Sequence, residues 1–233
     1  MTETSPNIQT FTPEELLGPL NEVEQQRSPK ELFVAGDASL FRMQPRVAVV
    51  GSRKASAEGI RRAENISKIL VQRGAIVVSG LAEGIDTAAH LAALAAGGRT
   101  IGVIGTPLDR SYPKSNEGLQ RRLIQGHAVL SQFPVGYPTQ PKCFPMRNAT
   151  MALIVSASVI VEAGDTSGAL SHGWETLRLG RMLFIMESVV NDSRLRWPRE
   201  MIGYGAEVLS DRNVEAFLDA LPAAELPHDA LAV

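Results

Sequence analysis

Seven short apolar runs alternate with helix-like segments along most of the chain, and this alternation limits the possible folds more than any other feature. The runs read RVAVVG, AIVVSG, TIGVIG, AVLSQFP, SVIVEAG, RMLFIM and AEVLS. Runs that are apolar at every residue indicate strands covered on both faces, as in a parallel sheet. Right-handed crossovers through the intervening helices then predict a Rossmann-like, doubly wound α/β fold, with a mostly parallel sheet and helices on both faces.

The alternation also predicts the domain organisation. Residues 46–221 are expected to form one Rossmann-like domain, because the pattern is uninterrupted over that range. Residues 1–45 are predicted to be a lead-in segment that packs on the domain, since a segment of this size cannot bury its own core. Residues 222–233 contain two prolines and are predicted to be a flexible tail.

Composition excludes several classes of protein. The net charge of -2 excludes binding of a polyanion through overall basicity, although a local basic groove is still possible. With Cys143 as its single cysteine, the chain has no intrachain disulfide, and its four scattered histidines predict no metal site. No signal peptide is visible, and the longest apolar run is too short to span a bilayer. These features indicate a cytoplasmic protein without a cofactor.

Four loops follow predicted strands at the carboxyl edge of the sheet, which is where open α/β sheets bind ligands. They read GSRKAS, SGLAEGID, GTPLDRSYP and EAGDTSGA. All contain glycine, and three open directly into a helix whose N-terminus favours an anion. Arg53 and Lys54 add full positive charges, so the loops predict a crevice for a phosphate-bearing ligand. The candidate residues here are Gly51, Ser52, Arg53, Lys54, Ser79, Gly80, Gly84, Ser167 and Gly168.

The same loops also have a structural interpretation, which the sequence leaves open. Glycine-rich turns occur in doubly wound proteins simply because the chain reverses tightly there. Ser167 is expected to cap the helix that follows it. Arg53 would pair with Glu83 or Asp86 under this interpretation, and its loss would then affect stability rather than binding.

Motifs for catalysis are absent from the sequence. It contains neither the P-loop pattern G-x-x-x-x-G-K-[ST] nor G-x-G-x-x-G after the first strand, and it has no G-x-S-x-G elbow. His90 lies in an alanine-rich helical segment and is expected to be packed there. His172 is predicted to lie one turn inside a helix, facing the crevice. We therefore expect no catalytic residues and no enzymatic activity.

The segment PTQPKCFPMRN interleaves cations with an aromatic side chain. Its candidate residues are Lys142, Phe144, Arg147 and Asn148. Proteins that bind single-stranded nucleic acid place cations along the backbone and aromatic faces against the bases. We interpret the segment as a loop that leads into a helix beginning near Met146. In the structural alternative, Phe144 plugs the core and Arg147 caps a helix.

Several of these motifs occur in the order seen in the DprA/Smf family of bacterial DNA-processing proteins. They are GDASLF, GSRKAS, SGLAEGID, GTPLDRSYPKSNEGL, SQFPVG, FPMRN and VIVEAGDTSGAL. The chain resembles that family from about Leu32 to Leu209. The resemblance implies a non-enzymatic protein that binds single-stranded DNA, forms a homodimer, and loads a RecA-type recombinase in natural transformation and DNA recombination. It also implies that Arg53 and the residues from Phe144 to Asn148 contact DNA.

The chain departs from the family pattern at two positions beside the FPMRN motif. Family members usually carry basic residues where this chain has Met146 and Ala149. Two fewer cations predict fewer phosphate contacts and a weaker salt dependence of binding. We therefore expect a short form of the family, without the N-terminal helical domain or the winged-helix-like domain of many members.

Two functions therefore remain open. A long groove for DNA needs cations beyond the crevice, and candidates for such a track are Arg110, Lys114, Arg121, Arg122 and Lys142. These cations favour single-stranded DNA as the ligand. The alternative is a nucleotide-binding sensor or a nucleotide N-glycosidase of the related phosphoribohydrolase-like group, which would use the same crevice.

Overall fold

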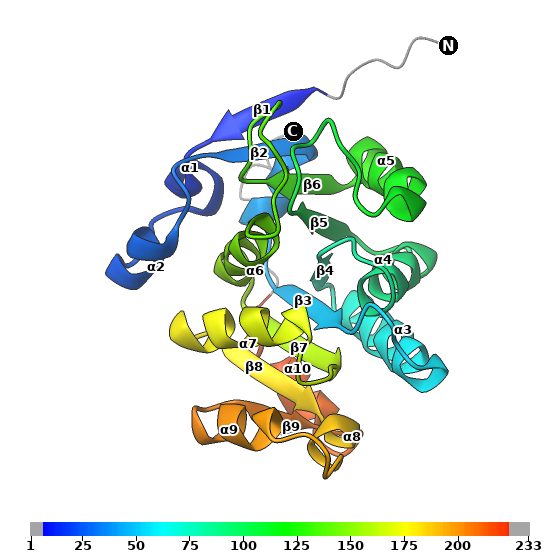
Figure 1. Cartoon of the computed structure of the whole chain (residues 1–233). Helices are drawn as coiled ribbons and strands as arrows, with labels where there is room; N and C mark the ends of the chain where they lie inside the picture. The colour runs from blue at the N-terminus through cyan, green and yellow to red at the C-terminus, as the bar shows by residue number, and fades with distance from the viewer. Residues whose placement is uncertain (1–6, 224–233) are drawn as a thin grey trace.

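A computed structural model describes residues 7–223 of the chain, and it contains one nine-stranded, mostly parallel sheet (Figure 1). The strands are β1 (Ile8–Phe11), β2 (Leu32–Gly36), β3 (Arg46–Gly51), β4 (Ile76–Ser79), β5 (Thr100–Ile104), β6 (Ala128–Ser131), β7 (Ala157–Glu162), β8 (Met182–Met186) and β9 (Glu207–Leu209). Their order across the sheet is β1-β2-β6-β5-β4-β3-β7-β8-β9. The predicted doubly wound, Rossmann-like fold is confirmed.

Helices connect the strands and cover the sheet on both faces. They are α1 (Pro13–Leu17), α2 (Glu22–Arg27), α3 (Ala57–Gln72), α4 (Ile85–Ala95), α5 (Glu117–Gly126), α6 (Cys143–Leu153), α7 (Gly168–Arg178), α8 (Glu187–Val190), α9 (Trp197–Gly203) and α10 (Val214–Ala220). Two short 3-10 helices, Ala38–Arg42 and Lys114–Asn116, lie in the connections.

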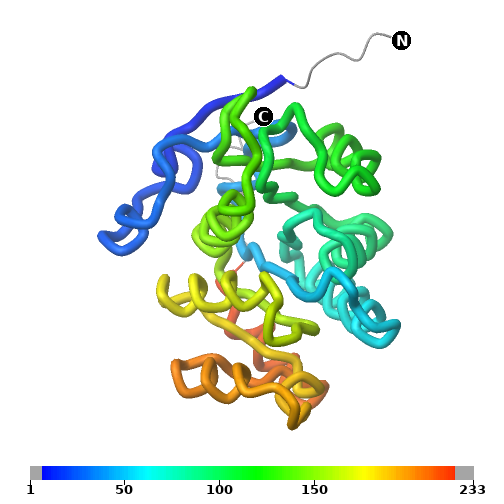
Figure 2. Tube along the Cα trace, in the orientation of Figure 1, coloured from blue at the N-terminus to red at the C-terminus, as the bar shows by residue number. Residues whose placement is uncertain are grey.

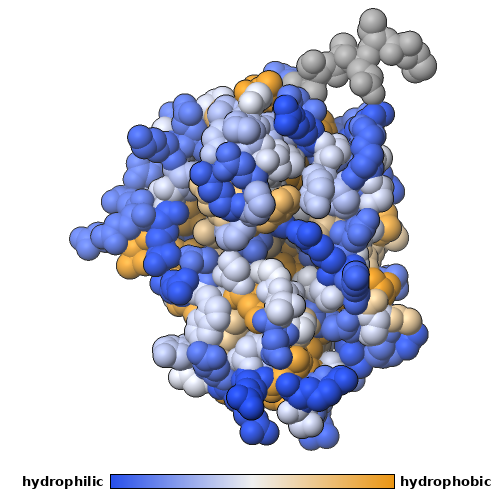
Figure 3. Space-filling model, in the orientation of Figure 1, coloured by the Kyte–Doolittle hydropathy of each residue, from blue (hydrophilic) through white to orange (hydrophobic). Residues whose placement is uncertain are grey.

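The central strand β3 shows why its sequence is apolar from Val47 onward. Val47 and Val49 pack into a core cluster with α3, α4 and α10. Ala48 and Val50 face the opposite side and pack with residues of α6, α7 and α9. Successive side chains of a strand point to opposite faces, so a strand covered on both faces needs an apolar residue at every position. The surface in Figure 3 is largely hydrophilic, with hydrophobic residues in separate patches.

The N-terminal segment extends the sheet, which the apolar-run pattern did not indicate. Strand β2 pairs antiparallel with β6, with Phe33 opposite Ser131, and β1 pairs antiparallel with β2. Figure 2 shows this N-terminal segment beside the chain around β6, at the opposite end of the molecule from the last helices. The division into a lead-in segment, a domain and a tail stays a prediction, and most of the tail, residues 224–233, lies outside the described residues.

A buried arginine fastens this extension to the central sheet. Arg46, at the start of β3, is 5% exposed and donates hydrogen bonds to the carbonyl oxygens of Phe41, Met43 and Ile154. Burial, followed by the charge of Arg181, lowers the pKa of Arg46 to about 10. The side chain therefore joins the connection before β3 to the end of α6.

Within residues 7–223, none of the helices combines the length and the apolar character needed to cross a bilayer.

Candidate functional site: a crevice at the carboxyl edge of the sheet

A crevice of about 530 Å³ opens at the carboxyl ends of β3 and β7. The loop after β3, the first turns of α6 and the N-terminus of α7 form its walls. The predicted residues that line it are Gly51, Ser52, Arg53, Lys54, Phe144, Arg147, Asn148, Ser167 and Gly168. The structure thus brings together four of the sequence segments singled out above, since Ala82 and Asp86 of SGLAEGID also line the crevice.

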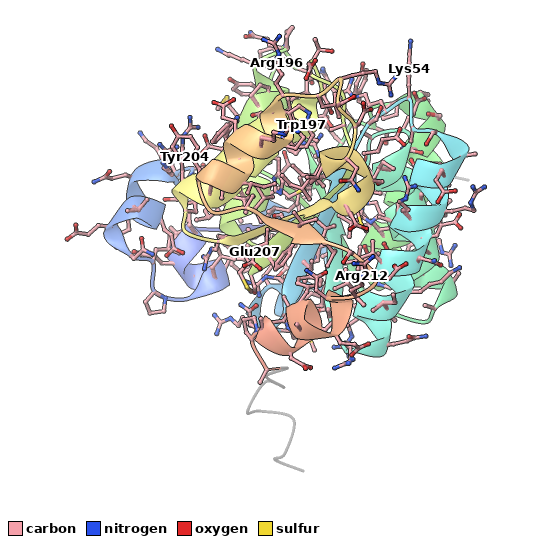
Figure 4. All side chains as sticks on the ribbon, turned by 90° about the horizontal axis from the view of Figure 1, so that it is seen from below. Lys54, Arg196, Trp197, Tyr204, Glu207 and Arg212 are labelled. Atoms are coloured by element: carbon pink, nitrogen blue, oxygen red, sulfur yellow. The ribbon has the colours of Figure 1, made fainter. Side chains whose placement is uncertain are left out.

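Arg53 and Phe144 form a cation–aromatic pair on the wall of this crevice. The guanidinium carbon of Arg53 lies 5.5 Å from the ring centroid of Phe144, within the range of a cation–π interaction. Arg53 is exposed, and among the described residues it forms no ion pair, so the alternative pairing with Glu83 or Asp86 is not observed. Lys54 is exposed beside it and points away from the ribbon in Figure 4.

The FPMRN motif is helical, and the prediction of a loop up to Met146 was wrong. Helix α6 begins at Cys143, and Pro145 is accommodated because first-turn amides need no intrahelical partner. Residues three and four apart share a helix face, so Phe144, Arg147 and Asn148 all line the crevice. Met146 does not line it, and its side chain is exposed. The helix therefore explains why this motif converges on one ligand site.

Arg147 is buried in the floor of the crevice and paired with a carboxylate. It is 6% exposed, and its Nη1 lies 3.9 Å from Oδ2 of Asp86 and 3.4 Å from the carbonyl oxygen of Val103. Its Nε has no hydrogen-bond partner within residues 7–223. A Cβ on Gly80 would lie 1.3 Å from Nη1 of Arg147, so this position must be glycine for the guanidinium to fit.

The backbone amides of the SGLAEGID loop are occupied by the chain's own carboxylate. Oδ2 of Asp86 accepts hydrogen bonds from the amides of Gly80 (3.2 Å) and Ala82 (3.3 Å). Burial raises the pKa of Asp86, and the charge of Arg147 opposes that rise. The loop was expected to offer its amides to a ligand anion, but Asp86 lies where that anion would bind.

Gly84 also serves contacts within the chain. Its φ of 73° lies in the left-handed region, and a Cβ would lie 2.3 Å from the carbonyl oxygen of Ser52. The amide of Ile85 donates to that same oxygen, at 3.2 Å. The N-terminus of α4 therefore packs against the loop after β3 and holds Arg53 in place, and Gly84 does not line the crevice.

Two other predicted positions also lie apart from the crevice. Ser79 is fully buried, and its hydroxyl donates to the carbonyl oxygen of Val49 at 2.7 Å. Its side chain is thus committed to holding β4 against β3. Lys142 is exposed at the N-cap position of α6 but does not line the crevice.

His172 lies beneath the crevice, and the prediction that it faces the ligand was wrong. It is fully buried; its Nδ1 donates to the carbonyl oxygen of Asn148 (3.2 Å) and its Nε2 accepts from the hydroxyl of Ser158 (2.9 Å). Burial lowers its pKa to about 4. His90 is packed, as predicted, and its Nδ1 hydrogen-bonds the hydroxyl of Thr100 at 2.7 Å.

Helices α6 and α7 are joined at the crevice by polar contacts. Nδ2 of Asn148 donates to the carbonyl oxygen of Gly168 at 2.9 Å. The predicted cap is confirmed, since the hydroxyl of Ser167 accepts from the amide of Ala169. These contacts fix the N-terminus of α7, whose partial positive charge favours an anion in the crevice.

The candidate cations of the track do not line the crevice. Lys114 and Arg121 both pair with Glu117, at 2.8 and 3.0 Å. Arg110, Arg122 and Lys142 are exposed elsewhere on the surface. Within the described part of the chain, no three His, Cys, Asp or Glu side chains gather closely enough to hold a metal ion.

Sequence reasoning missed Tyr112, which lies next to the cation–aromatic pair. Its ring centroid is 5.3 Å from that of Phe144. Behind Phe144, as seen from the crevice, a second cavity of about 50 Å³ is lined by Arg53, Gly80, Ala82, Glu83, Gly105, Tyr112, Pro113, Phe144 and Arg147. We call this cavity the small hollow. The signal for Tyr112 was present, because an exposed aromatic residue in a strand-end loop is a candidate for ligand stacking.

Comparison with known proteins finds relatives over nearly the whole described chain. The sequence profile of a family described as DNA recombination-mediator protein A matches residues 10–222. DNA processing protein DprA of Streptococcus pneumoniae is 38% identical over 183 residues, which are 78% of this chain and 64% of that protein. The chain therefore spans less than two thirds of that relative's length.

Solved structures show the same fold. The X-ray structure of DprA from Streptococcus pneumoniae matches with a TM-score of 0.76 and 34% identity, over 90% of this chain and 74% of that one. DprA from Helicobacter pylori, described as having a unique single-stranded DNA binding mode, matches with a TM-score of 0.76. It is 24% identical, over 91% of this chain and 94% of that one, so this likeness shows the fold alone.

Proposed function

This chain belongs to the DNA recombination-mediator protein A family, the DprA/Smf proteins, and on that premise we propose that its crevice binds single-stranded DNA. The observation that carries the proposal is the pair formed by Arg53 and Phe144 on the crevice wall. Single-strand binding combines cations that contact the phosphates with aromatic faces that stack on bases, and the pair supplies one of each.

The charges around the crevice support a phosphate backbone as the ligand. Arg53 and Lys54 are exposed and carry no ion pair among the described residues, whereas the charge of Arg147 is balanced by Asp86. The N-terminus of α7 adds a partial positive charge on the opposite wall. A guanidinium can hold a phosphate through two hydrogen bonds, so Arg53 is the main phosphate contact in this proposal.

The crevice favours contacts that do not depend on base sequence. Its cations and helix N-terminus contact phosphate, which is the same in every nucleotide, and Phe144 offers an aromatic face that any base can stack on. Binding in the crevice is thus non-enzymatic and positions a strand without chemical change. We also propose that the protein is cytoplasmic. Its single cysteine, Cys143, is a free thiol, which is compatible with the reducing conditions of the cytoplasm.

The family description names a recombination mediator, and we propose in addition that the protein loads a RecA-type recombinase in DNA uptake or processing. A homodimer belongs to the same proposal. Sedimentation or light scattering at tens of micromolar distinguishes a dimer from the 25.1 kDa monomer. A monomer at that concentration would contradict the homodimer without affecting the DNA-binding proposal.

Fluorescence anisotropy with labelled oligothymidine, at two salt concentrations, tests the DNA-binding proposal. We expect binding that weakens with salt, because phosphate contacts release counterions. Free mono- and dinucleotides serve as competitors. The crevice volume of about 530 Å³ is within the range of small-molecule sites, so a nucleotide sensor or N-glycosidase is the second candidate. Tight binding of a free nucleotide, with no binding of the oligonucleotide, would favour it.

A further inference from the structure

The small hollow continues the crevice past Phe144. Arg53, Ala82, Phe144 and Arg147 line both cavities, so the Arg53–Phe144 pair lies at their junction. A strand that crosses this pair brings its next base to the mouth of the hollow. The inference below concerns that base and rests on the proposed function of the crevice.

The walls of the small hollow suit a flat, partly apolar group. Tyr112 is 51% exposed, and its ring lies 5.3 Å from that of Phe144 at an angle of 49°, with Pro113 beside it. The volume of about 50 Å³ compares with the roughly 10–15 Å³ that one water molecule needs. The hollow therefore has room for the edge of one small ring but not for a whole nucleotide.

A carboxylate at the rim selects against phosphate. The hydroxyl of Ser115 donates to Oε1 of Glu83 at 2.9 Å, which orients the carboxylate. No other hydrogen bond reaches Glu83 within residues 7–223, so Oε2 is available to a ligand donor. A carboxylate repels phosphate and accepts hydrogen bonds from an amino group, as it does from N4 of cytosine.

Arg147 lines the same hollow, but its buried Nε is closed off from it. That nitrogen exposes almost no surface and has no hydrogen-bond partner in the described part of the chain. The polar group that the hollow offers to a ligand is therefore the carboxylate of Glu83, beside the exposed ring of Tyr112.

We propose that the small hollow binds the Watson–Crick edge of a cytosine base, stacked beside Tyr112, with Glu83 accepting from N4. Uracil has the same ring, but it presents the O4 acceptor where cytosine presents the N4 amino group. Glu83 would then face an oxygen, and the complex would lose a hydrogen bond and gain a repulsion. The protein thus prefers strands with cytosine over strands with uracil at this position.

The test compares two labelled oligonucleotides of equal length, oligodeoxycytidine and oligodeoxyuridine, by anisotropy at pH 8. For the unmodified protein we expect about tenfold tighter binding of the cytosine strand, the discrimination expected from one specific base contact. Glu83→Gln should reduce the ratio to near one, because an amide can donate to O4 as readily as it accepts from N4. Glu22→Gln removes the same charge on α2 and should leave the ratio unchanged.

A second variant tests the aromatic wall. Tyr112→Ala should weaken binding of both strands several-fold, whereas Tyr112→Phe keeps the ring and should bind as the unmodified protein does. Equal affinity of the unmodified protein for both strands, or a cytosine preference that survives in Glu83→Gln, would overturn the inference. If the strands bind equally and Arg53→Ala still weakens binding, the proposed function stands without the base subsite. If neither strand binds, both proposals fail.

Discussion

The guanidinium of Arg53 lies over the ring of Phe144, 5.5 Å from its centroid, although Arg53 follows β3 and Phe144 belongs to α6. The contact stands at the junction of the crevice and the small hollow. A cation and an aromatic face are therefore already placed together before a strand arrives, which reduces the ordering cost of binding.

Replacement of Arg53 by alanine should weaken binding of oligothymidine about tenfold to a hundredfold, since a charge-assisted phosphate contact is lost. The loss should be nearly independent of base sequence, and the slope of log K against log salt should fall by about one phosphate contact. Arg53→Lys keeps the charge but not the two-pronged geometry and should be intermediate.

The control for Arg53 is Arg212→Ala. Figure 4 shows Arg212 well separated from Lys54, the neighbour of Arg53 in the crevice loop, and Arg212 should therefore not affect binding. Unchanged oligothymidine affinity in a correctly folded Arg53→Ala protein would contradict the crevice as the DNA site.

Replacement of Arg147 by alanine should lower the free energy of unfolding by about 3–5 kcal/mol, because it leaves Asp86 buried without its cation. Urea denaturation measures the change. The double variant Arg147→Met with Asp86→Asn should recover most of it, since no unpaired charge remains and asparagine can still accept from the Gly80 and Ala82 amides. A loss below about 1 kcal/mol in Arg147→Ala would show that the pair matters little to stability.

Stability should fall when the pH is lowered from 7 to 5. Burial lowers the pKa of His172 to about 4 and that of His90 to about 3, below their ordinary value of 6.5. The unfolded chain then binds more protons than the folded one, so stability present above pH 6.5 is lost as the pH falls. The linkage relation gives about 2 kcal/mol for each histidine over this interval.

The variant His172→Gln separates the contribution of His172 to this pH dependence from the contributions of other titrating groups, such as Asp86. Its free energy of unfolding should change less between pH 7 and 5 than that of the unmodified protein, by about 2 kcal/mol. An identical pH dependence in the two proteins would mean that His172 is protonated within the fold.

Replacement of Arg46 by methionine should lower the free energy of unfolding by about 3 kcal/mol or more, because three carbonyl oxygens lose their donor in a buried setting. Urea denaturation again measures it. Arg46→Lys retains a cation with fewer directed donors and should lose less. Full stability in Arg46→Met would indicate that water replaces the guanidinium at these carbonyls.

The parallel part of the fold could be predicted from sequence because its signal is local. Each central strand is an uninterrupted apolar run, and each run is followed by a helix with a recognisable end, such as Gly74 after α3. Strand β2 lies before the alternating pattern, with only a short 3-10 helix between it and β3, so the pattern did not indicate that it joins the sheet antiparallel to β6. Helices α8 and α9 follow β8 and are only 4 and 7 residues long. Such short helices contain too few residues for a helical hydrophobic period to be recognised in the sequence.

Most residues that line the candidate site could be predicted from the sequence, but the contacts between them could not. Arg53 and Phe144 could be singled out by residue type and position, yet their contact depends on the helical start of α6, which Pro145 masked. The role of Asp86 was also hidden, since only the fold shows that its carboxylate takes the amides of Gly80 and Ala82. The position of Tyr112 beside Phe144 was likewise not predictable, since the two rings come from segments far apart in the sequence.

The antiparallel pairing of β2 with β6 has a consequence for synthesis on the ribosome. Phe33 lies opposite Ser131, so β2 leaves the ribosome long before its partner exists. Strand β1 can already pair with one edge of β2, but the edge that pairs with β6 has no native partner until β6 emerges. The edge of the sheet that is synthesised first is therefore completed late. During synthesis, the unpaired edge of β2 is the part of the nascent chain most exposed to chaperones and to mispairing with another copy of the protein.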